Sequence, residues 1–252
     1  MTNLVIDIGN TFAKISVFIN DSIVFVSQEK EVNNQSVSGI IHQYKVQNVI
    51  ISSVKKQDNL FFNHFKDLKI FHFNNQLPIP IKNGYATPAT LGADRLAGVI
   101  GAKKIFPDNA VLVIDAGTCI TYDFIDEAGL YAGGSISPGL NMRFKAMHHF
   151  TGKLPEIAVN EAVNTFENVY GINTQESLIS GVVNGLLFEA EGFISKYNHQ
   201  QSNLRVILCG GDSTFFDTRL KNSIFAHQIL LEPNLVMIGL NTVVNYQHDK
   251  KN

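Results

Sequence analysis

The chain has 252 residues, of which 45% are hydrophobic and 17% charged, and its formal net charge is −2. A composition of this kind is typical of a soluble globular protein with one large domain or two compact halves. The small net charge argues against the broad basic surface of a nucleic-acid-binding protein. We therefore expect no nucleic acid among its partners.

The sequence also disfavours membrane insertion and secretion. No uninterrupted apolar run is long enough to cross a bilayer, and the segment Met1–Asp7 lacks the basic residues that open a signal peptide. The two cysteines, Cys119 and Cys209, are too few and too far apart for a disulfide framework or a zinc site. These features predict a cytoplasmic protein with reduced thiols and no membrane partner.

The first part of the chain, residues 1–108, is predicted to open with an antiparallel meander. Three short apolar runs are separated by turn-forming residues, first Gly9-Asn10-Thr11 and then Asn20-Asp21-Ser22. The predicted elements are strands at Leu4–Ile8, Ile15–Ile19 and Ile23–Val26, a helix at Ser36–Tyr44, a strand at Asn48–Ser52 and a helix at Leu96–Ile105.

The second part of the chain, residues 109–252, begins in the same way. The turn Asp7-x-Gly9 recurs as Asp115-x-Gly117, and each copy joins two apolar runs. Two copies of one pattern predict duplicated halves that meet near residue 108. The other predicted elements are strands at Val111–Ile114, Ile120–Ile125 and Leu204–Leu208, and helices at Asn141–His149, Thr174–Lys196 and Leu235–Asn245.

The two Asp-x-Gly turns are candidate phosphate-binding loops. An aspartate that ends a buried strand needs a metal, a lysine or backbone N–H donors to offset its desolvation, and the glycine lets the backbone approach a ligand closely. The hydroxyl of Thr11 or Thr118 can donate to a phosphate oxygen, and Gly210-Gly211 ends a third predicted strand. The pattern predicts a phosphate clamp with a carboxylate for Mg²⁺ and its waters. A single Asp-x-Gly is otherwise only a hairpin turn, and the chain contains neither a P-loop nor a dinucleotide-binding glycine pattern.

An adjacent acid and base, Asp94 and Arg95, precede the predicted helix at Leu96–Ile105. Helix N-termini attract anions, so an arginine there can bind a substrate carboxylate in a bidentate way. The aspartate can accept a hydroxyl proton during attack on a γ-phosphate, because phosphoryl transfer depends mainly on positioning and charge stabilisation. The structural alternative is a helix cap with an exposed salt bridge.

These residues belong to a series of motifs that runs in a fixed order from the first strand to the last helix. The motifs are Asp7-Ile8-Gly9-Asn10-Thr11-Phe12-Ala13-Lys14, Gly92-Ala93-Asp94-Arg95, Asp115-Ala116-Gly117-Thr118, Gly133-Gly134-Ser135-Ile136-Ser137-Pro138-Gly139, Thr151-Gly152-Lys153-Leu154-Pro155, Asn173-Thr174-Gln175-Glu176-Ser177 and Gly210-Gly211-Asp212. In this order the motifs resemble those of the type III pantothenate kinases of bacteria.

The resemblance implies an α/β, duplicated ribonuclease-H-like fold of the actin and sugar-kinase superfamily, with a mixed sheet flanked by helices in each half. It also implies ATP-dependent phosphorylation of pantothenate to 4′-phosphopantothenate, the first step of coenzyme A biosynthesis, by a homodimer with pantothenate close to the subunit interface. Asp94 would be the general base, Asp115 would bind the monovalent cation K⁺ or NH₄⁺, and Asp7 would bind Mg²⁺ through water. The implied pantothenate-binding residues are Tyr85, Gly92, Ala93, Asp94, Arg95 and Thr174. The implied ATP-binding residues are Asp7, Ile8, Gly9, Asn10, Thr11, Phe12, Ala13, Lys14, Thr118, Gly210 and Gly211.

Two other functions fit parts of the sequence. A non-catalytic nucleotide-binding regulator could share the fold, although it would have no need of a base such as Asp94. A nuclease or phosphatase on a ribonuclease-H-like core would gather several carboxylates around two metals, whereas Asp7 and Asp115 are separate strand-end acids. One departure from the family pattern is Cys119, where the resemblance implies alanine after the threonine.

Overall fold

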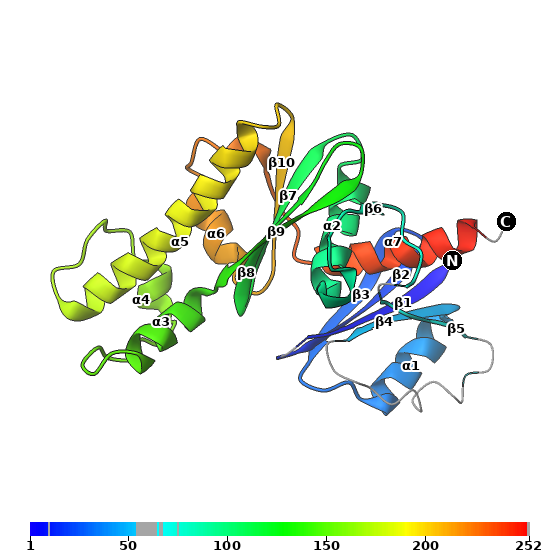
Figure 1. Cartoon of the computed structure of the whole chain (residues 1–252). Coiled ribbons are helices and arrows are strands. Elements are labelled where there is room, and N and C mark those ends of the chain that lie inside the picture. The colour runs from blue at the N-terminus through cyan, green and yellow to red at the C-terminus, as the bar shows by residue number, and fades with distance from the viewer. Residues whose placement is uncertain (10, 54–64, 66–67, 75, 251–252) are drawn as a thin grey trace. The chain divides into compact units, whose positions relative to one another are not determined.

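The computed structural model describes residues 1–9, 11–53, 65, 68–74 and 76–250 (Figure 1). The chain divides into two compact units. The first unit comprises Met1–Pro107, Gly129–Tyr131 and Asn234–Asn252, and the second comprises Asp108–Ala128 and Ala132–Pro233. The C-terminal segment therefore packs with the N-terminal part of the chain, a long-range association that the sequence pattern did not indicate.

The first unit is built on a five-stranded sheet with the order β3-β2-β1-β4-β5. β1 pairs antiparallel with β2 and parallel with β4. The strands and helices up to residue 107 are β1 (Thr2–Ile8), β2 (Ala13–Ile19), β3 (Ser22–Glu29), α1 (Asn34–Tyr44), β4 (Asn48–Ser53), β5 (Lys69–His72), β6 (Lys82–Asn83), a short 3-10 turn (Pro88–Thr90) and α2 (Ala93–Ile105). Every strand and helix predicted for residues 1–108 is present, with ends that differ by a few residues.

The two faces of this sheet are covered differently. On one face, alternate residues of β1 such as Leu4 and Ile6 are fully buried against Val37 and Ile41 of α1. The other face contacts the C-terminal helix α7 (Leu235–Asp249). This contact includes polar groups: the Asn3 side-chain amide donates to Asn241 Oδ1 at 2.7 Å and to Asn245 Oδ1 at 3.0 Å.

Helices α2 and α7 pack with their backbones in close approach. A Cβ atom added at Gly239 would overlap the carbonyl oxygen of Ala97, and one added at Gly101 would overlap that of Leu235. Glycine at both positions therefore lets the helices meet without an intervening side chain. This contact holds the first turn of α2, which carries Asp94 and Arg95, in the first unit.

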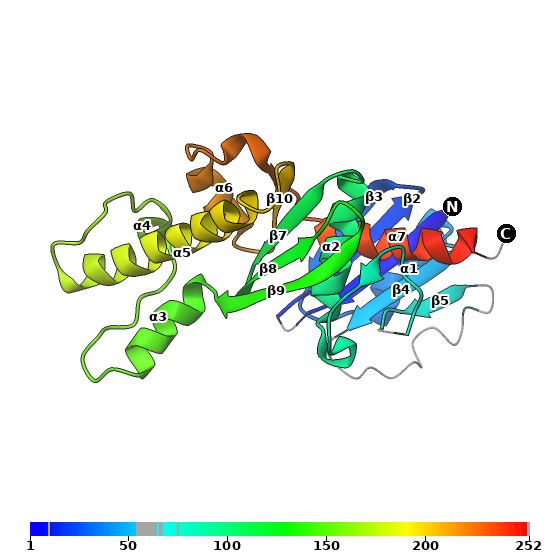
Figure 2. The same cartoon turned by 45° about the horizontal axis from the view of Figure 1, so that its top comes forward.

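The second unit repeats the strand order of the first. Its sheet reads β11-β10-β7-β8-β9, with the short β6 added beyond β9, and β7 pairs antiparallel with β8 and parallel with β10. Figure 2 shows β7, β8 and β9 side by side. The elements are β7 (Ala110–Ala116), β8 (Cys119–Ile125), β9 (Leu130–Pro138), α3 (Leu140–His149), α4 (Glu161–Asn164), α5 (Thr174–Asn198), β10 (Leu204–Cys209), α6 (Ser213–Leu220), a 3-10 turn (Ala226–Gln228) and β11 (Ile229–Leu231).

The repeated strand order confirms the duplication that the two Asp-x-Gly turns predicted. The central strand is β1 in the first unit and β7 in the second. Each pairs antiparallel with the strand that follows its turn, β2 or β8, and parallel with the fourth strand of its unit, β4 or β10. The carboxyl ends of β1 and β7 therefore occupy equivalent places in the two sheets. Each of these ends carries an aspartate and a glycine.

The long helix α5 forms much of the core of the second unit. Leu178, Val182 and Leu186 are buried among side chains of the sheet. Among the described residues, α5 is the one helix whose length and composition alone would permit a membrane span, with a mean hydropathy of 1.3. Because the buried core helix of a soluble protein meets the same criterion, α5 is weak evidence for such a span.

Candidate active site

The first Asp-x-Gly turn connects β1 to β2 by a tight backbone reversal. The Gly9 N–H donates to the Phe12 carbonyl at 3.0 Å, and a Cβ atom added at Gly9 would lie 3.2 Å from that oxygen. Thr11 and Phe12 are exposed at the tip of the turn, whereas Asn10 lies outside the described residues. The turn thus presents a hydroxyl and backbone groups at the carboxyl end of β1, as a phosphate-binding loop requires.

Asp7 occupies an unusual environment at the end of β1. Parallel pairing places it beside Ser52 of β4, and antiparallel pairing places it beside Lys14 of β2. Burial raises the pKa of the Asp7 carboxyl to about 6, although a hydrogen bond from Ser52 and the charge of Lys14 act to lower it. The negative charge of Asp94 adds to the increase. Asp7, Lys14 and Asp94 therefore share one electrostatic environment in the first unit.

The raised pKa of Asp7 makes the stability of the protein depend on pH. The native state binds this proton more tightly than the unfolded chain does, so the contribution of Asp7 to the free energy of unfolding falls as pH rises from about 4 to about 6. We expect Asp7→Asn, which cannot ionise, to be more stable than the wild type at pH 8 by up to about 3 kcal/mol. Urea unfolding at pH 4 and pH 8 measures the effect.

The matched control for this experiment is Asp108→Asn, which removes an exposed carboxyl from the loop before β7. It should change the free energy of unfolding by less than about 0.5 kcal/mol at either pH. If Asp7→Asn gains the same stability at pH 4 and at pH 8, the gain does not come from the raised pKa of the Asp7 carboxyl.

The first turn of α2 brings Gly92, Asp94 and Arg95 together. A Cβ atom added at Gly92 would lie 2.5 Å from Asp94 Oδ1, so glycine makes room for the carboxylate. Asp94 is exposed, and its Oδ1 also accepts the backbone N–H of Arg95 at 2.8 Å. The N-cap position is Gly92, so Asp94 lies within the first helical turn and is not the capping residue. Ala93 is the first residue of the helix.

Arg95 is buried and is held beside an aromatic ring. Its side chain is 8% exposed, and its guanidinium carbon lies 5.6 Å from the centre of the Tyr85 ring. This separation allows a cation–π interaction. Tyr85 is partly buried, and its backbone N–H donates to Asn83 Oδ1 at 3.0 Å. Tyr85, Gly92, Asp94 and Arg95 thus all belong to the first unit.

The second Asp-x-Gly turn is packed against two glycine-containing segments. The Gly117 N–H donates to the Cys119 carbonyl at 3.0 Å, and the Gly139 N–H donates to the Thr118 carbonyl at 3.1 Å. Gly210 has φ +89°, and a Cβ atom there would overlap Asp115 Oδ1 and the carbonyl oxygen of Ala116. The structure therefore brings Asp115, Thr118 and Gly210 together within the second unit.

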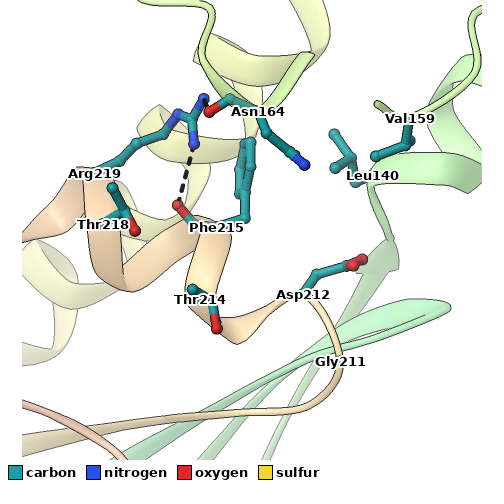
Figure 3. Close-up of a pocket in the computed structure, with 9 residues that line it drawn as sticks. All are labelled: Leu140, Val159, Asn164, Gly211, Asp212, Thr214, Phe215, Thr218 and Arg219. Carbon is teal, nitrogen blue, oxygen red and sulfur yellow. Dashed lines mark hydrogen bonds between the residues drawn. The ribbon is translucent and has the colours of Figure 1, made fainter. Parts of the chain in front are cut away.

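A pocket opens beside this cluster, where α6 and the Gly211–Asp212 turn before it face Leu140, Val159 and Asn164 (Figure 3). Its volume is about 260 Å³. Gly211 and Asp212 line it, and burial raises the pKa of the Asp212 carboxyl. Arg219 and Phe215 of α6 also line the pocket; the Arg219 guanidinium donates to the Asn164 carbonyl at 2.7 Å and stacks over the Phe215 ring at 4.0 Å from its centre. The remaining lining residues are Thr214 and Thr218.

Thr174 belongs to a different unit from the other predicted pantothenate-binding residues. It is the exposed first residue of α5 in the second unit, whereas the others belong to the first. Asn173 and Glu176 build the helix start, because Asn173 Oδ1 accepts the Glu176 N–H at 2.9 Å and its amide donates back to Glu176 Oε1 at 2.8 Å. The start of α5, where Thr174 lies, is therefore capped by hydrogen bonds.

The structure adds residues that the sequence did not single out. Ser52 contacts Asp7 because β1 and β4 pair in parallel. In the sequence, this contact could have been indicated only by the fact that the serine and the aspartate each lie at the end of a predicted strand. Asn164 and Arg219 line the pocket through elements far apart in sequence. Across the described ranges, no three His, Cys, Asp or Glu side chains gather in a way that could hold a metal ion.

Comparison with known proteins identifies the family. Residues 3–196 match the family described as type III pantothenate kinase. The chain is also 41% identical over 246 residues to a type III pantothenate kinase of Phocaeicola vulgatus, covering 97% of this chain and 98% of the relative. The chain belongs to the type III pantothenate kinase family.

Solved structures confirm the fold expected for a type III pantothenate kinase. A Baf family protein from Campylobacter jejuni superimposes with a TM-score of 0.60 at 19% identity, over 98% of this chain and 99% of that one. The activator of the 2-hydroxyisocaproyl-CoA dehydratase from Clostridium difficile, with bound ADPNP, gives a TM-score of 0.55 at 14% identity, over 100% and 97%. The α/β, duplicated ribonuclease-H-like fold of actin-like ATPases and sugar kinases is thus confirmed.

Proposed function

We propose that this chain, as a pantothenate kinase, transfers the γ-phosphoryl group of ATP to the hydroxyl of pantothenate with Asp94 as the general base. The observation that carries the proposal is the exposed Asp94 carboxylate in the first turn of α2, adjacent to the buried Arg95. A carboxylate suffices as base because phosphoryl transfer is catalysed mainly by positioning and by stabilisation of charge. The product is 4′-phosphopantothenate, and the reaction is the first step of coenzyme A biosynthesis.

Pantothenate is proposed to bind at the N-terminus of α2. The carboxylate of pantothenate matches the guanidinium of Arg95, and backbone N–H groups at Gly92 and Ala93 add donors at the positive end of the helix. Tyr85 would form an aromatic wall, since its ring lies against the Arg95 guanidinium. Thr174 belongs to the second unit, and its exposed hydroxyl is proposed to bind pantothenate.

ATP is proposed to bind through the two equivalent turns. In the first unit, the segment Asp7–Lys14 offers backbone N–H groups, the Thr11 hydroxyl and the Lys14 ammonium to phosphate oxygens. In the second unit, the Thr118 hydroxyl would do the same, and the pocket beside Gly210 and Gly211 would take the adenosine. Its mixture of apolar and polar lining is typical of small-molecule sites.

The residues present fit a divalent and a monovalent cation. Kinases of this kind use ATP with a divalent metal, which neutralises charge on the transferred phosphoryl group. Asp7 would hold Mg²⁺ through water. Its carboxylate is partly buried, and Lys14 is the one positively charged residue among the groups that shift its pKa, so a cation would offset the remaining cost of burial. Asp115 would hold K⁺ or NH₄⁺, since its carboxylate and the Ala116 carbonyl oxygen converge against Gly210.

The proposed assembly is a homodimer in the cytoplasm, without nucleic acid or membrane partners. The segment before α5 exposes apolar side chains, with Val169 75%, Tyr170 74% and Ile172 83% exposed, and Phe188 of α5 is 63% exposed. Exposed apolar residues gathered near one element mark interaction sites. A second copy seated there would lie next to Thr174, which fits pantothenate binding close to the subunit interface. Light scattering should then give a mass of twice 27.9 kDa.

A coupled assay of ADP formation tests the proposed function directly. We expect ADP release that depends on pantothenate and that increases when K⁺ or NH₄⁺ replaces Na⁺. A non-catalytic regulator would instead bind ATP in a titration and release no ADP with any concentration of pantothenate. Cleavage of a nucleic acid or a phosphate ester without ATP would favour a nuclease or a phosphatase.

Cys119 offers a chemical test of the proposed ATP site. Its thiol is partly buried at the start of β8, directly after Thr118. We expect a thiol reagent to inactivate the enzyme partially and ATP to slow the inactivation, because bound phosphates would shield the turn. Cys119→Ala is the control, and it should retain activity after treatment. Inactivation at the same rate with and without ATP would count against this placement.

A further inference from the structure

Tyr131 is a buried residue that neither the sequence motifs nor the proposed mechanism uses. It belongs to the short segment Gly129–Tyr131, which packs with the first unit although the chain on both sides of it belongs to the second. Its side chain is fully buried. Its ring stacks on that of Tyr85, with 6.1 Å between centroids and 7° between planes.

The backbone around Tyr131 also pairs with the segment that leads to Tyr85. β6 pairs in parallel with the first residues of β9, and Asn83 lies opposite Tyr131 in the register. The Gly84 N–H donates to the Tyr131 carbonyl at 2.9 Å. A Cβ atom at Gly84 would lie 3.0 Å from that oxygen, so glycine permits this close approach.

The Tyr85 ring therefore has two neighbours. It stacks on the Tyr131 ring, and the Arg95 guanidinium carbon lies 5.6 Å from its centre. A tyrosine ring has two main rotational degrees of freedom, and a stacked buried neighbour removes much of that freedom. The position of the Tyr85 ring in turn restricts the guanidinium that lies against it.

We propose that Tyr131 is a positioning residue for the pantothenate site, which acts by holding the Tyr85 ring in place beside Arg95. The inference rests on the proposed function, in which Tyr85 and Arg95 bind pantothenate. Tyr131 itself needs no contact with the substrate. Its ring, and not its hydroxyl, carries the stacking interaction with Tyr85.

Steady-state kinetics of Tyr131→Leu and Tyr131→Phe test the proposal. Tyr131→Leu should raise the KM for pantothenate about three- to ten-fold, the range expected for the loss of one aromatic pair. The KM for ATP should change less than two-fold, since Tyr85, on which this ring stacks, is not among the proposed ATP-binding residues. Tyr131→Phe keeps the stack and should restore the KM for pantothenate to within two-fold of the wild type.

A matched control separates positioning from loss of stability. Tyr122 is also fully buried, and its ring stacks on Phe193 in the second unit. Tyr122→Leu should lower the melting temperature as Tyr131→Leu does, but it should leave the KM for pantothenate unchanged. If the control raises that KM equally, the effect of Tyr131→Leu is one of general destabilisation and the proposal is wrong.

The double variant Tyr85→Leu/Tyr131→Leu shows whether Tyr131 acts through Tyr85. If it does, the double variant binds pantothenate no more weakly than Tyr85→Leu alone, whereas independent effects would add. If Tyr85→Leu alone leaves the KM unchanged, the proposed role of Tyr85 in binding fails and the inference about Tyr131 fails with it. If Tyr85→Leu raises the KM and Tyr131→Leu does not, the inference alone is overturned.

Discussion

We expect Asp94→Asn to lower kcat by about 100- to 10,000-fold, which is the usual contribution of a general base. The substitution preserves the shape of the side chain, and its Oδ1 can still accept the Arg95 N–H that Asp94 accepts at 2.8 Å. The first turn of α2 should therefore remain intact. Because the amide cannot take the proton of the pantothenate hydroxyl, the loss should appear in turnover and not in substrate binding.

Measurements of folding, of the KM for pantothenate and of a control variant show whether the loss of turnover comes from the missing base. Circular dichroism and thermal unfolding should match the wild type, and the KM for pantothenate should change little. The control variant Asp108→Asn removes an exposed carboxyl outside the proposed site and should keep full turnover. An Asp94→Asn enzyme that keeps more than half of the wild-type kcat would show that the base has been wrongly assigned.

The second large effect is expected from Gly210→Ala. Gly210 has φ +89°, a left-handed conformation that costs a residue with a Cβ atom about 1–2 kcal/mol. The added methyl group would also overlap Asp115 Oδ1 and the Ala116 carbonyl oxygen, and overpacking of this kind costs about 1–3 kcal/mol. We expect a loss of about 2–5 kcal/mol in the free energy of unfolding. Urea unfolding of the purified variant measures it.

The neighbouring glycine provides the control for this experiment. Among the described residues other than its two chain neighbours, none places a heavy atom within 4 Å of a Cβ atom added at Gly211. Gly211→Ala should therefore change the free energy of unfolding by less than about 0.5 kcal/mol. Since Gly210 lies against Asp115, Gly210→Ala should also lower the stimulation of turnover by K⁺ if Asp115 binds the cation. Equal stability of the two variants would contradict the close packing around Gly210.

Local sequence patterns determined the type and order of most elements. The short apolar runs in β1 and β2 and the turn residues between them are short-range signals, and both strands lie where they were predicted. The repeated Asp-x-Gly turn indicated the duplication, because a repeat is visible without knowledge of long-range contacts. Strand β9 was missed, since Gly133 and Gly134 within it resemble a loop in composition.

Only the tertiary structure decided which of these residues lie together. Asn3 and Asn241 are 238 residues apart, and their hydrogen bond helps attach α7 to the sheet of the first unit. Ser52 reaches Asp7, and Tyr131 reaches Tyr85, through parallel strand pairing that no local pattern encodes. Burial then raises the pKa of Asp7 to about 6. The sequence by itself determined which chemical groups are available, and long-range packing decided their neighbours and hence their charge and orientation.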